Sequence, residues 1–218
     1  MDVPVKNRMH WELTYIFLLT GLIILLAAAV RGCSEQMAVA GFAAALALNC
    51  WVWKQTVSRT VVYLHNGLNI ICAVLLAYLL SAYVFVSDST VIGAAFGVVV
   101  MDVFSFTKRG GFTLNARLME RKNTAVRLSV CLPVPGKRGL IPVIGTGDLV
   151  FYSLLTIVPL QSVNRAGPLI AVLPILAGQL LNLAIIAALK NRAGFKGFPA
   201  TLMPGLLFIA VVLPGIQP

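Results

Sequence analysis

Seven apolar stretches dominate the chain, and each is long enough to form a helix that crosses a lipid bilayer. They run over about 11–30, 36–53, 60–85, 89–107, 140–160, 167–189 and 198–214. Hydrophobic residues make up 59% of the 218 residues and charged residues 11%, whereas soluble domains carry about 25% charged residues. We therefore predict an all-α membrane protein, a single domain over 1–218 that folds as a bundle of seven transmembrane helices.

The basic residues divide unevenly between the two sides of this predicted bundle. Fifteen of the seventeen Lys and Arg residues fall in the N-terminal segment and in the loops after the second, fourth and sixth stretches, and two, Arg31 and Arg165, fall in the opposite loops. By the positive-inside rule the N-terminus and the long loop 108–139 are cytoplasmic and the C-terminus is outside. The net charge of +10 is then a topology signal that also attracts anionic lipid, so we expect a lipid bilayer and no nucleic acid as partner. The expected location is an integral, multi-pass one, in the plasma membrane if the host is prokaryotic.

Two aspartates, Asp102 and Asp148, lie inside the apolar stretches. An ionisable group in hydrocarbon costs several kcal/mol and rarely persists without a role. Asp102 precedes Lys108 by six residues and Asp148 follows Arg138 by ten, so at about 1.5 Å per residue they lie roughly 9 and 15 Å from the cytoplasmic edge. The two helices are consecutive and antiparallel, so the carboxyl groups can meet. Two carboxyl groups that share one proton can activate a water, one as general base and the other as general acid.

The sequence around these aspartates resembles a known family. Gly145-Thr146-Gly147-Asp148-Leu149-Val150-Phe151-Tyr152-Ser153 is similar to the GxGD signature of presenilins, and Val100-Met101-Asp102-Val103-Phe104 resembles the family's other catalytic helix. The resemblance covers about 89–214 and implies an intramembrane aspartyl protease of the presenilin and signal peptide peptidase superfamily, in a shortened form. It implies that Asp102 and Asp148 are catalytic, without metal or organic cofactor. Met101 stands where the family has tyrosine, so any role of that hydroxyl is lost or moved.

Further residues are predicted to shape this site. Side chains in place of Gly145 and Gly147 would crowd the facing helix or block a substrate backbone. Tyr152 shares a helix face with Asp148, so its hydroxyl can reach the site; an interior packing tyrosine is the other interpretation. The segment 198–204, Phe-Pro-Ala-Thr-Leu-Met-Pro, resembles the family's Pro-Ala-Leu motif with Thr201 inserted. The resemblance assigns site-shaping roles to three residues of this segment, and a simple helix start is the alternative; the three are Pro199, Ala200 and Leu202.

The cytoplasmic loop and the remaining polar residues carry two more expectations. Residues 125–132 alternate with period two, which predicts a short strand near the site to which an unwound substrate could pair; a loosely packed loop is the alternative. Polar residues inside the helices indicate hydrogen bonds between helices; they are His65, Asn66, Asn69, Gln179 and Asn182.

Together these patterns divide the single domain into three parts. Residues 11–85 form three N-terminal helices, 89–160 form the catalytic helix pair with loop 108–139, and 167–214 form two C-terminal helices with the Pro-Ala-Leu-like segment. The predicted substrates are single transmembrane helices with their N-terminus outside; the sequence predicts no particular accessory subunit. Two alternatives stay open: a proton- or cation-coupled transporter that uses the same two aspartates, and a catalytically silent presenilin relative.

Overall fold

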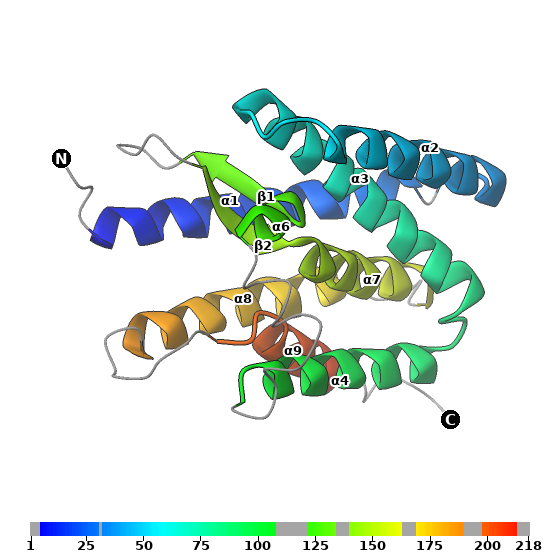
Figure 1. The fold of residues 1–218 in the computed structure, drawn as a ribbon. Helices are drawn as coiled ribbons and strands as arrows, with labels where there is room; N and C mark the ends of the chain where they lie inside the picture. The colour runs from blue at the N-terminus through cyan, green and yellow to red at the C-terminus, as the bar shows by residue number, and fades with distance from the viewer. Residues whose placement is uncertain are drawn as a thin grey trace.

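The computed structural model describes residues 5–30, 32–107, 122–133, 140–162, 169–189 and 198–212, and this part of the chain is mostly helical (Figure 1). The longer helices are α1 (Val5–Val30), α2 (Glu35–Trp53), α3 (Arg59–Tyr83), α4 (Asp88–Ser105), α7 (Thr146–Ser162), α8 (Leu169–Leu189) and α9 (Leu202–Val212). Within the described ranges, three helical segments are long and apolar enough to cross a membrane, namely Glu35–Trp53, Arg59–Tyr83 and Val172–Leu189. Shorter apolar helices lie in α1, α4, α7 and α9. Two parts of the predicted cytoplasmic loop lie outside the described residues, namely 108–121 and 134–139. The same holds for Arg31 and Arg165.

Serine residues set the starts of three of these helices. Ser34, Ser58 and Ser87 have extended backbones, and each side-chain oxygen accepts a hydrogen bond from the backbone N–H three residues later. Such a cap satisfies one of the N–H groups that a helix start leaves without an intrahelical partner. The helices therefore begin within a residue or two of the positions that the apolar stretches predict.

The all-helical prediction is wrong in one region, which forms a short antiparallel sheet. Strand β1 (Ser129–Pro133) pairs with strand β2 (Leu140–Gly145), and a short helix, α6 (Lys122–Arg127), precedes them. The strand expected over 125–132 is confirmed for 129–132, while 125–127 is helical. The helix expected over 140–160 begins only at Thr146.

Local chemistry explains why the chain changes from strand to helix at Thr146. Pro142 has no N–H for a helix interior, and the β-branched Val143 and Ile144 fit an extended backbone. The backbone N–H and the hydroxyl of Thr146 each donate to the carbonyl oxygen of Leu128, both at 2.8 Å. This pair of hydrogen bonds ties the first turn of α7 to the base of the β1–β2 hairpin.

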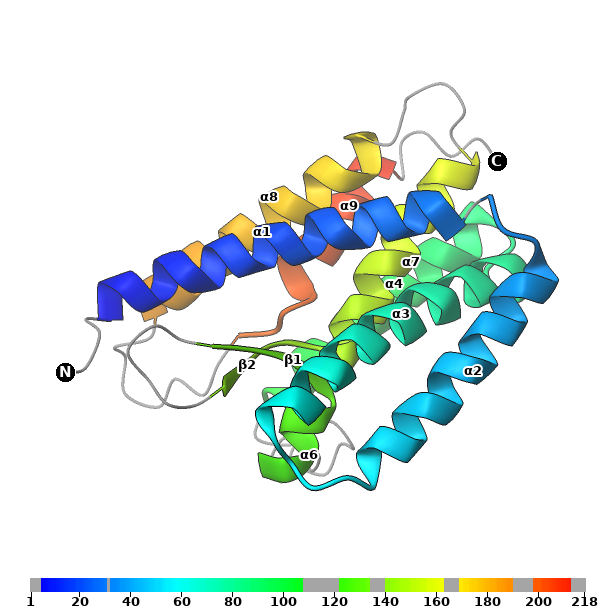
Figure 2. The same ribbon diagram turned by 90° about the horizontal axis from the view of Figure 1, so that it is seen from above.

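Helix α7 lies at the centre of the fold, between α3 on one side and α4 and α9 on the other (Figure 1). Every residue from Phe151 to Val158 is buried, and α1 also packs against α7, next to α8 (Figure 2). A helix that is apolar and enclosed on all sides is typical of the core of a bundle. Its N-terminal end, which carries Asp148, lies beside the hairpin.

Two glycines allow α9 to come close to its neighbours. A Cβ atom on Gly178 of α8 would overlap the backbone of Pro204, and one on Gly205 would overlap the side chain of Val99 and lie 3.3 Å from Phe151. Small residues permit such close helix crossings. The close approach holds the start of α9 against both α4 and α8.

The outer helices present large apolar side chains away from the protein. On α2 these include Met37 and Trp51, and on α4 they include Phe96 and Met101. Helices with apolar residues on both their inner and outer faces are typical of a protein surrounded by lipid.

Candidate active site

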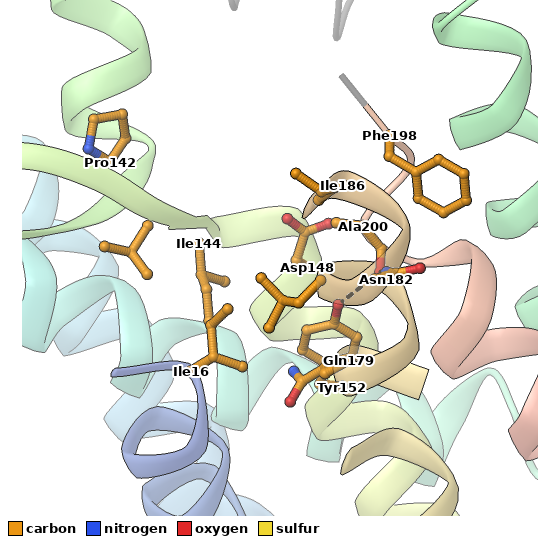
Figure 3. A pocket seen from close by; sticks show the side chains of 12 residues that line it. Ile16, Pro142, Ile144, Asp148, Tyr152, Gln179, Asn182, Ile186, Phe198 and Ala200 are labelled. Carbon is orange, nitrogen blue, oxygen red and sulfur yellow. Dashed lines mark hydrogen bonds between the residues drawn. The ribbon is translucent and has the colours of Figure 1, made fainter. Parts of the chain in front are cut away.

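A cavity of about 240 Å³ lies at the N-terminal end of α7, and Asp148 is in its wall (Figure 3). Residues from α1, β2, α7, α8 and the segment before α9 line it. Most of its walls are apolar, with side chains such as Ile16, Ile144 and Ile186. The polar lining side chains are Asp148, Tyr152, Gln179 and Asn182. The arrangement combines a carboxyl group with a mostly apolar pocket.

Gly145 lies directly against the carboxyl group of Asp148. A Cβ atom added to Gly145 would lie 3.3 Å from Oδ2 of Asp148 and 3.9 Å from its Cγ. A side chain at this position would therefore press on the aspartate itself, rather than on a facing helix. Gly147 is exposed, and an added Cβ would meet no described atom within 4 Å, so crowding inside the protein does not explain this second glycine.

Asp102 is half-buried on α4 and is bound by the segment that precedes α9. The backbone N–H of Thr201 donates to Oδ2 of Asp102 at 3.1 Å, and the Thr201 hydroxyl donates to the same oxygen at 2.7 Å. Thr201 follows Ala200, which lines the cavity of Asp148. The segment before α9 therefore borders the cavity of Asp148 and also holds Asp102, while Asp102 is not among the residues that line the cavity.

The backbone carbonyl of Ala200 is the second fixed point of this segment. The Tyr152 hydroxyl donates to it at 3.0 Å, and the Asn182 side-chain amide donates to it at 2.6 Å (Figure 3). The same Asn182 amide also donates to the carbonyl of Pro199 at 3.3 Å. Because Tyr152 is on α7 and Asn182 on α8, the segment Pro199–Thr201 is attached to three helices, with α4 as the third.

Three of the predicted site residues line the cavity, while Gly147 and Leu202 are not among the residues that form its wall. Asp148, Tyr152 and Ala200 line the cavity, and Pro199 is buried beside it with its carbonyl bound by Asn182. Leu202 instead packs against the apolar cluster formed by residues of α4, α7, α8 and α9. The role of Tyr152 is therefore polar as well as packing, while Leu202 belongs to the core.

Sequence reasoning missed several residues of the site. It treated Thr201 only as an insertion in the Pro-Ala-Leu-like segment, although this residue donates two hydrogen bonds to Asp102. It expected Gln179 and Asn182 to join helices, and Gln179 does so by accepting a hydrogen bond from Thr20 of α1 at 3.0 Å. Both residues also line the cavity. The signal in the sequence was their polarity within an apolar helix.

A second polar network joins α2 and α3 to the base of the hairpin. Asn69 donates to the carbonyl of Arg127 at 2.9 Å, Asn49 donates to Asn69 at 2.8 Å, and Nδ1 of His65 lies 2.9 Å from Oδ1 of Asn49. Because the Asn49 amide nitrogen is directed at Asn69, its oxygen must accept, so His65 carries its proton on Nδ1. The expectation of a hydrogen-bonded interior His65 is confirmed.

Arg127 closes this network from the other side. Its guanidinium donates to the backbone carbonyls of Trp53 and Gln55 and lies over the Trp53 ring, 5.5 Å from the ring centroid. A guanidinium above an aromatic face is attracted by the ring quadrupole. The turn between α2 and α3 is therefore anchored to the short helix that leads into β1.

Comparison of the chain with protein-family models, with curated proteins and with solved structures finds no match. The presenilin resemblance therefore rests on the motifs around the two aspartates and on the Pro-Ala-Leu-like segment alone.

Proposed function

We propose that this protein is an intramembrane aspartyl protease of the presenilin-like GxGD type, which hydrolyses peptide bonds of single-span membrane helices. The observation that carries the proposal is that Asp148 of α7 lies in the wall of a mostly apolar cavity, and that the segment Ala200–Thr201, which borders this cavity, binds Asp102 of α4. Two acidic groups held around one apolar pocket support acid–base hydrolysis of an apolar chain. The proposal includes a bundle of seven transmembrane helices with the N-terminus cytoplasmic and the C-terminus outside.

In the proposed reaction the two carboxyl groups hold one water between them. One carboxylate takes a proton from the water while the oxygen of the water bonds to the carbonyl carbon of the peptide. The other carboxyl group gives a proton to the peptide nitrogen as the carbon–nitrogen bond breaks. The products are a new carboxyl end and a new amine. The pair acts as one titrating unit, and the reaction uses no metal or organic cofactor.

The strand of the hairpin whose edge is free is the one to which a substrate could pair. One edge of β1 pairs with β2, and at Cys131 the other edge is occupied by the side chain of Asn66. Within the described part of the chain β2 has no second strand neighbour. Its residues Pro142, Val143 and Ile144 line the cavity together with Asp148. An unwound substrate would therefore add to β2, and not to 125–132 as the sequence pattern suggested.

Strand β2 and the aspartate pair also constrain the chain direction in which a substrate can pass the site. β2 leads directly into α7, so a substrate strand beside β2 passes Asp148 in one chain direction only. With the hairpin on the cytoplasmic side, we propose that substrates enter with their N-terminus outside. Apolar side chains such as Leu183 and Phe198 suit the apolar residues of a transmembrane helix.

A reconstituted cleavage assay tests this function. The chain alone is placed in liposomes with a single-span helical reporter in each of the two orientations, and the products are identified by mass spectrometry. We expect a cut within the reporter whose N-terminus is outside, and little cutting of the reversed one. Proton flux across the liposome membrane without any cleavage would instead support a transporter. The absence of both cleavage and proton flux would support a catalytically silent relative.

A further inference from the structure

We propose that Thr201 is a positioning residue for Asp102, which fixes the orientation of its carboxyl group for attack by water. The inference rests on the proposed protease function and names a residue that the Pro-Ala-Leu resemblance leaves without a role. It starts from the two hydrogen bonds that Thr201 donates to one oxygen, Oδ2 of Asp102.

Two donors on one carboxyl oxygen define the position of the whole group. The N–H and the hydroxyl of Thr201 both donate to Oδ2, at 3.1 and 2.7 Å, so a rotation that moves Oδ2 away would lose both hydrogen bonds. Oδ1 is then the oxygen left to hold a water. A general base must keep its acceptor within hydrogen-bond distance of the reacting water, and Thr201 leaves one oxygen for that task.

Thr201 is itself held rigidly, as a positioning residue requires. It is 3% exposed, and the carbonyl of the preceding Ala200 accepts hydrogen bonds from Tyr152 and Asn182. On its other side, the close contact of Gly178 with Pro204 prevents the start of α9 from moving toward α8. Side chains that hold a reacting group are effective when their own conformation is fixed by packing and hydrogen bonds.

An ordinary structural role does not account for the Thr201 side chain. A threonine just before a helix usually accepts a hydrogen bond from the N–H of the second or third helical residue. Here the third residue of α9 is Pro204, which has no N–H. The hydroxyl donates to Asp102 instead, 99 positions away in the sequence.

The residue before Asp102 does not supply this hydroxyl. Met101 is 58% exposed and has no hydrogen-bond donor in its side chain. The hydroxyl that touches Asp102 comes from Thr201, on a different element.

The test uses the full chain in liposomes and the reporter helix whose N-terminus is outside. Steady-state cleavage is measured so that kcat and KM are obtained separately. Thr201→Val keeps the shape and the backbone N–H but removes the hydroxyl. We expect kcat to fall by about 100-fold, the loss that a misplacement of about 1 Å can cause, with KM nearly unchanged. Thr201→Ser restores the hydroxyl and should recover most of kcat. Thr156→Val is the matched control, because the buried Thr156 hydroxyl bonds only a carbonyl of its own helix.

Thermal unfolding in detergent separates positioning from folding, and Thr201→Ala provides a smaller replacement if Thr201→Val fails to fold. A wild-type kcat in folded Thr201→Val or Thr201→Ala would overturn the inference, as would a Thr201→Ser variant as slow as Thr201→Val. Asp102→Asn and Asp148→Asn are measured beside them. If these two are inactive while Thr201→Val is not impaired, only the role of Thr201 fails; if they still cleave, the proposed function fails.

Discussion

The side-chain amide of Asn66 pairs with both backbone polar groups of Cys131, as a neighbouring strand would. Its nitrogen donates to the Cys131 carbonyl at 2.6 Å, and its oxygen accepts from the Cys131 N–H at 2.8 Å. A single residue of α3 thereby closes the edge of β1 that β2 leaves open. Because unpaired strand edges recruit other strands, this contact leaves β2 as the edge to which the proposed substrate would add.

Replacement of Asn66 should loosen the hairpin. In Asn66→Leu both polar groups of the buried Cys131 backbone lose their partner, at about 1–3 kcal/mol for each unsatisfied group. We expect a lower unfolding temperature, slower cleavage, and a reporter that cross-links to β1 as well as to β2. Ile71→Ala, at an exposed position of the same helix, serves as control. Wild-type stability and cross-linking to β2 alone in Asn66→Leu would show that the contact does not hold the strand.

The thiol of Cys131 should report on the hairpin through its pH dependence. Burial raises the pKa of this thiol from 9.0 to about 11, and its side chain is 0% exposed. The folded state keeps the thiol protonated to a higher pH than the unfolded chain does. Its contribution to stability is therefore present below pH 9 and is lost as the pH rises through about 11.

Maleimide labelling measures this effect in a variant that keeps Cys131 as its single cysteine. Since the thiolate is the reactive form, we expect slow labelling from pH 7 to 9 and a rise only toward pH 11. In Asn66→Leu the labelling should become faster at every pH. A fast reaction of Cys131 at pH 8 in the otherwise unchanged protein would contradict the burial of β1.

Gly145→Ala should impair catalysis more than stability. The new methyl group would lie 3.3 Å from Oδ2 of Asp148, so the carboxyl group must move by a few tenths of an ångström. We expect kcat to fall about 10-fold or more, since catalysis depends on the geometry of reacting groups, with little change in the unfolding temperature. Gly93→Ala on α4, where an added Cβ meets no described atom within 4 Å, is the matched control. Equal activity of the two variants would remove the steric role of Gly145.

The helices could be predicted from sequence because their causes are local, while the pairing of Asp102 with Asp148 stays a prediction. Each apolar stretch is a continuous run, and serines such as Ser58 and Ser87 mark helix starts with nearby backbone partners. The spacing of Asp102 and Asp148 from the basic loop placed them at comparable depths. The strand β2 was missed because Leu140–Gly145 is apolar and continuous with α7, and such a run has no period that separates a strand from a buried helix.

The contacts that complete the site could not be predicted because they depend on how distant elements pack. Thr201 meets Asp102 across 99 positions, and Gln179 meets Thr20 across 159. The Thr201 contact depends on the glycines that let α9 approach α8 and α4, and the Gln179 contact depends on the packing of α1 against α8. No local sequence pattern reveals either packing. The same packing turned Leu202 toward the apolar core and Thr201 toward the aspartate.

The central claim is that Asp102 and Asp148 act together on one water. The most direct measurement compares single-turnover cleavage of the reporter by Asp102→Asn, Asp148→Asn and the double variant, each checked for wild-type unfolding behaviour. When residues act as one catalytic unit, removing one of them lowers the rate about as much as removing all of them. The account predicts that each single variant falls to the rate of the double variant. Partial losses that multiply in the double variant, or cleavage that survives in either single variant, would contradict it.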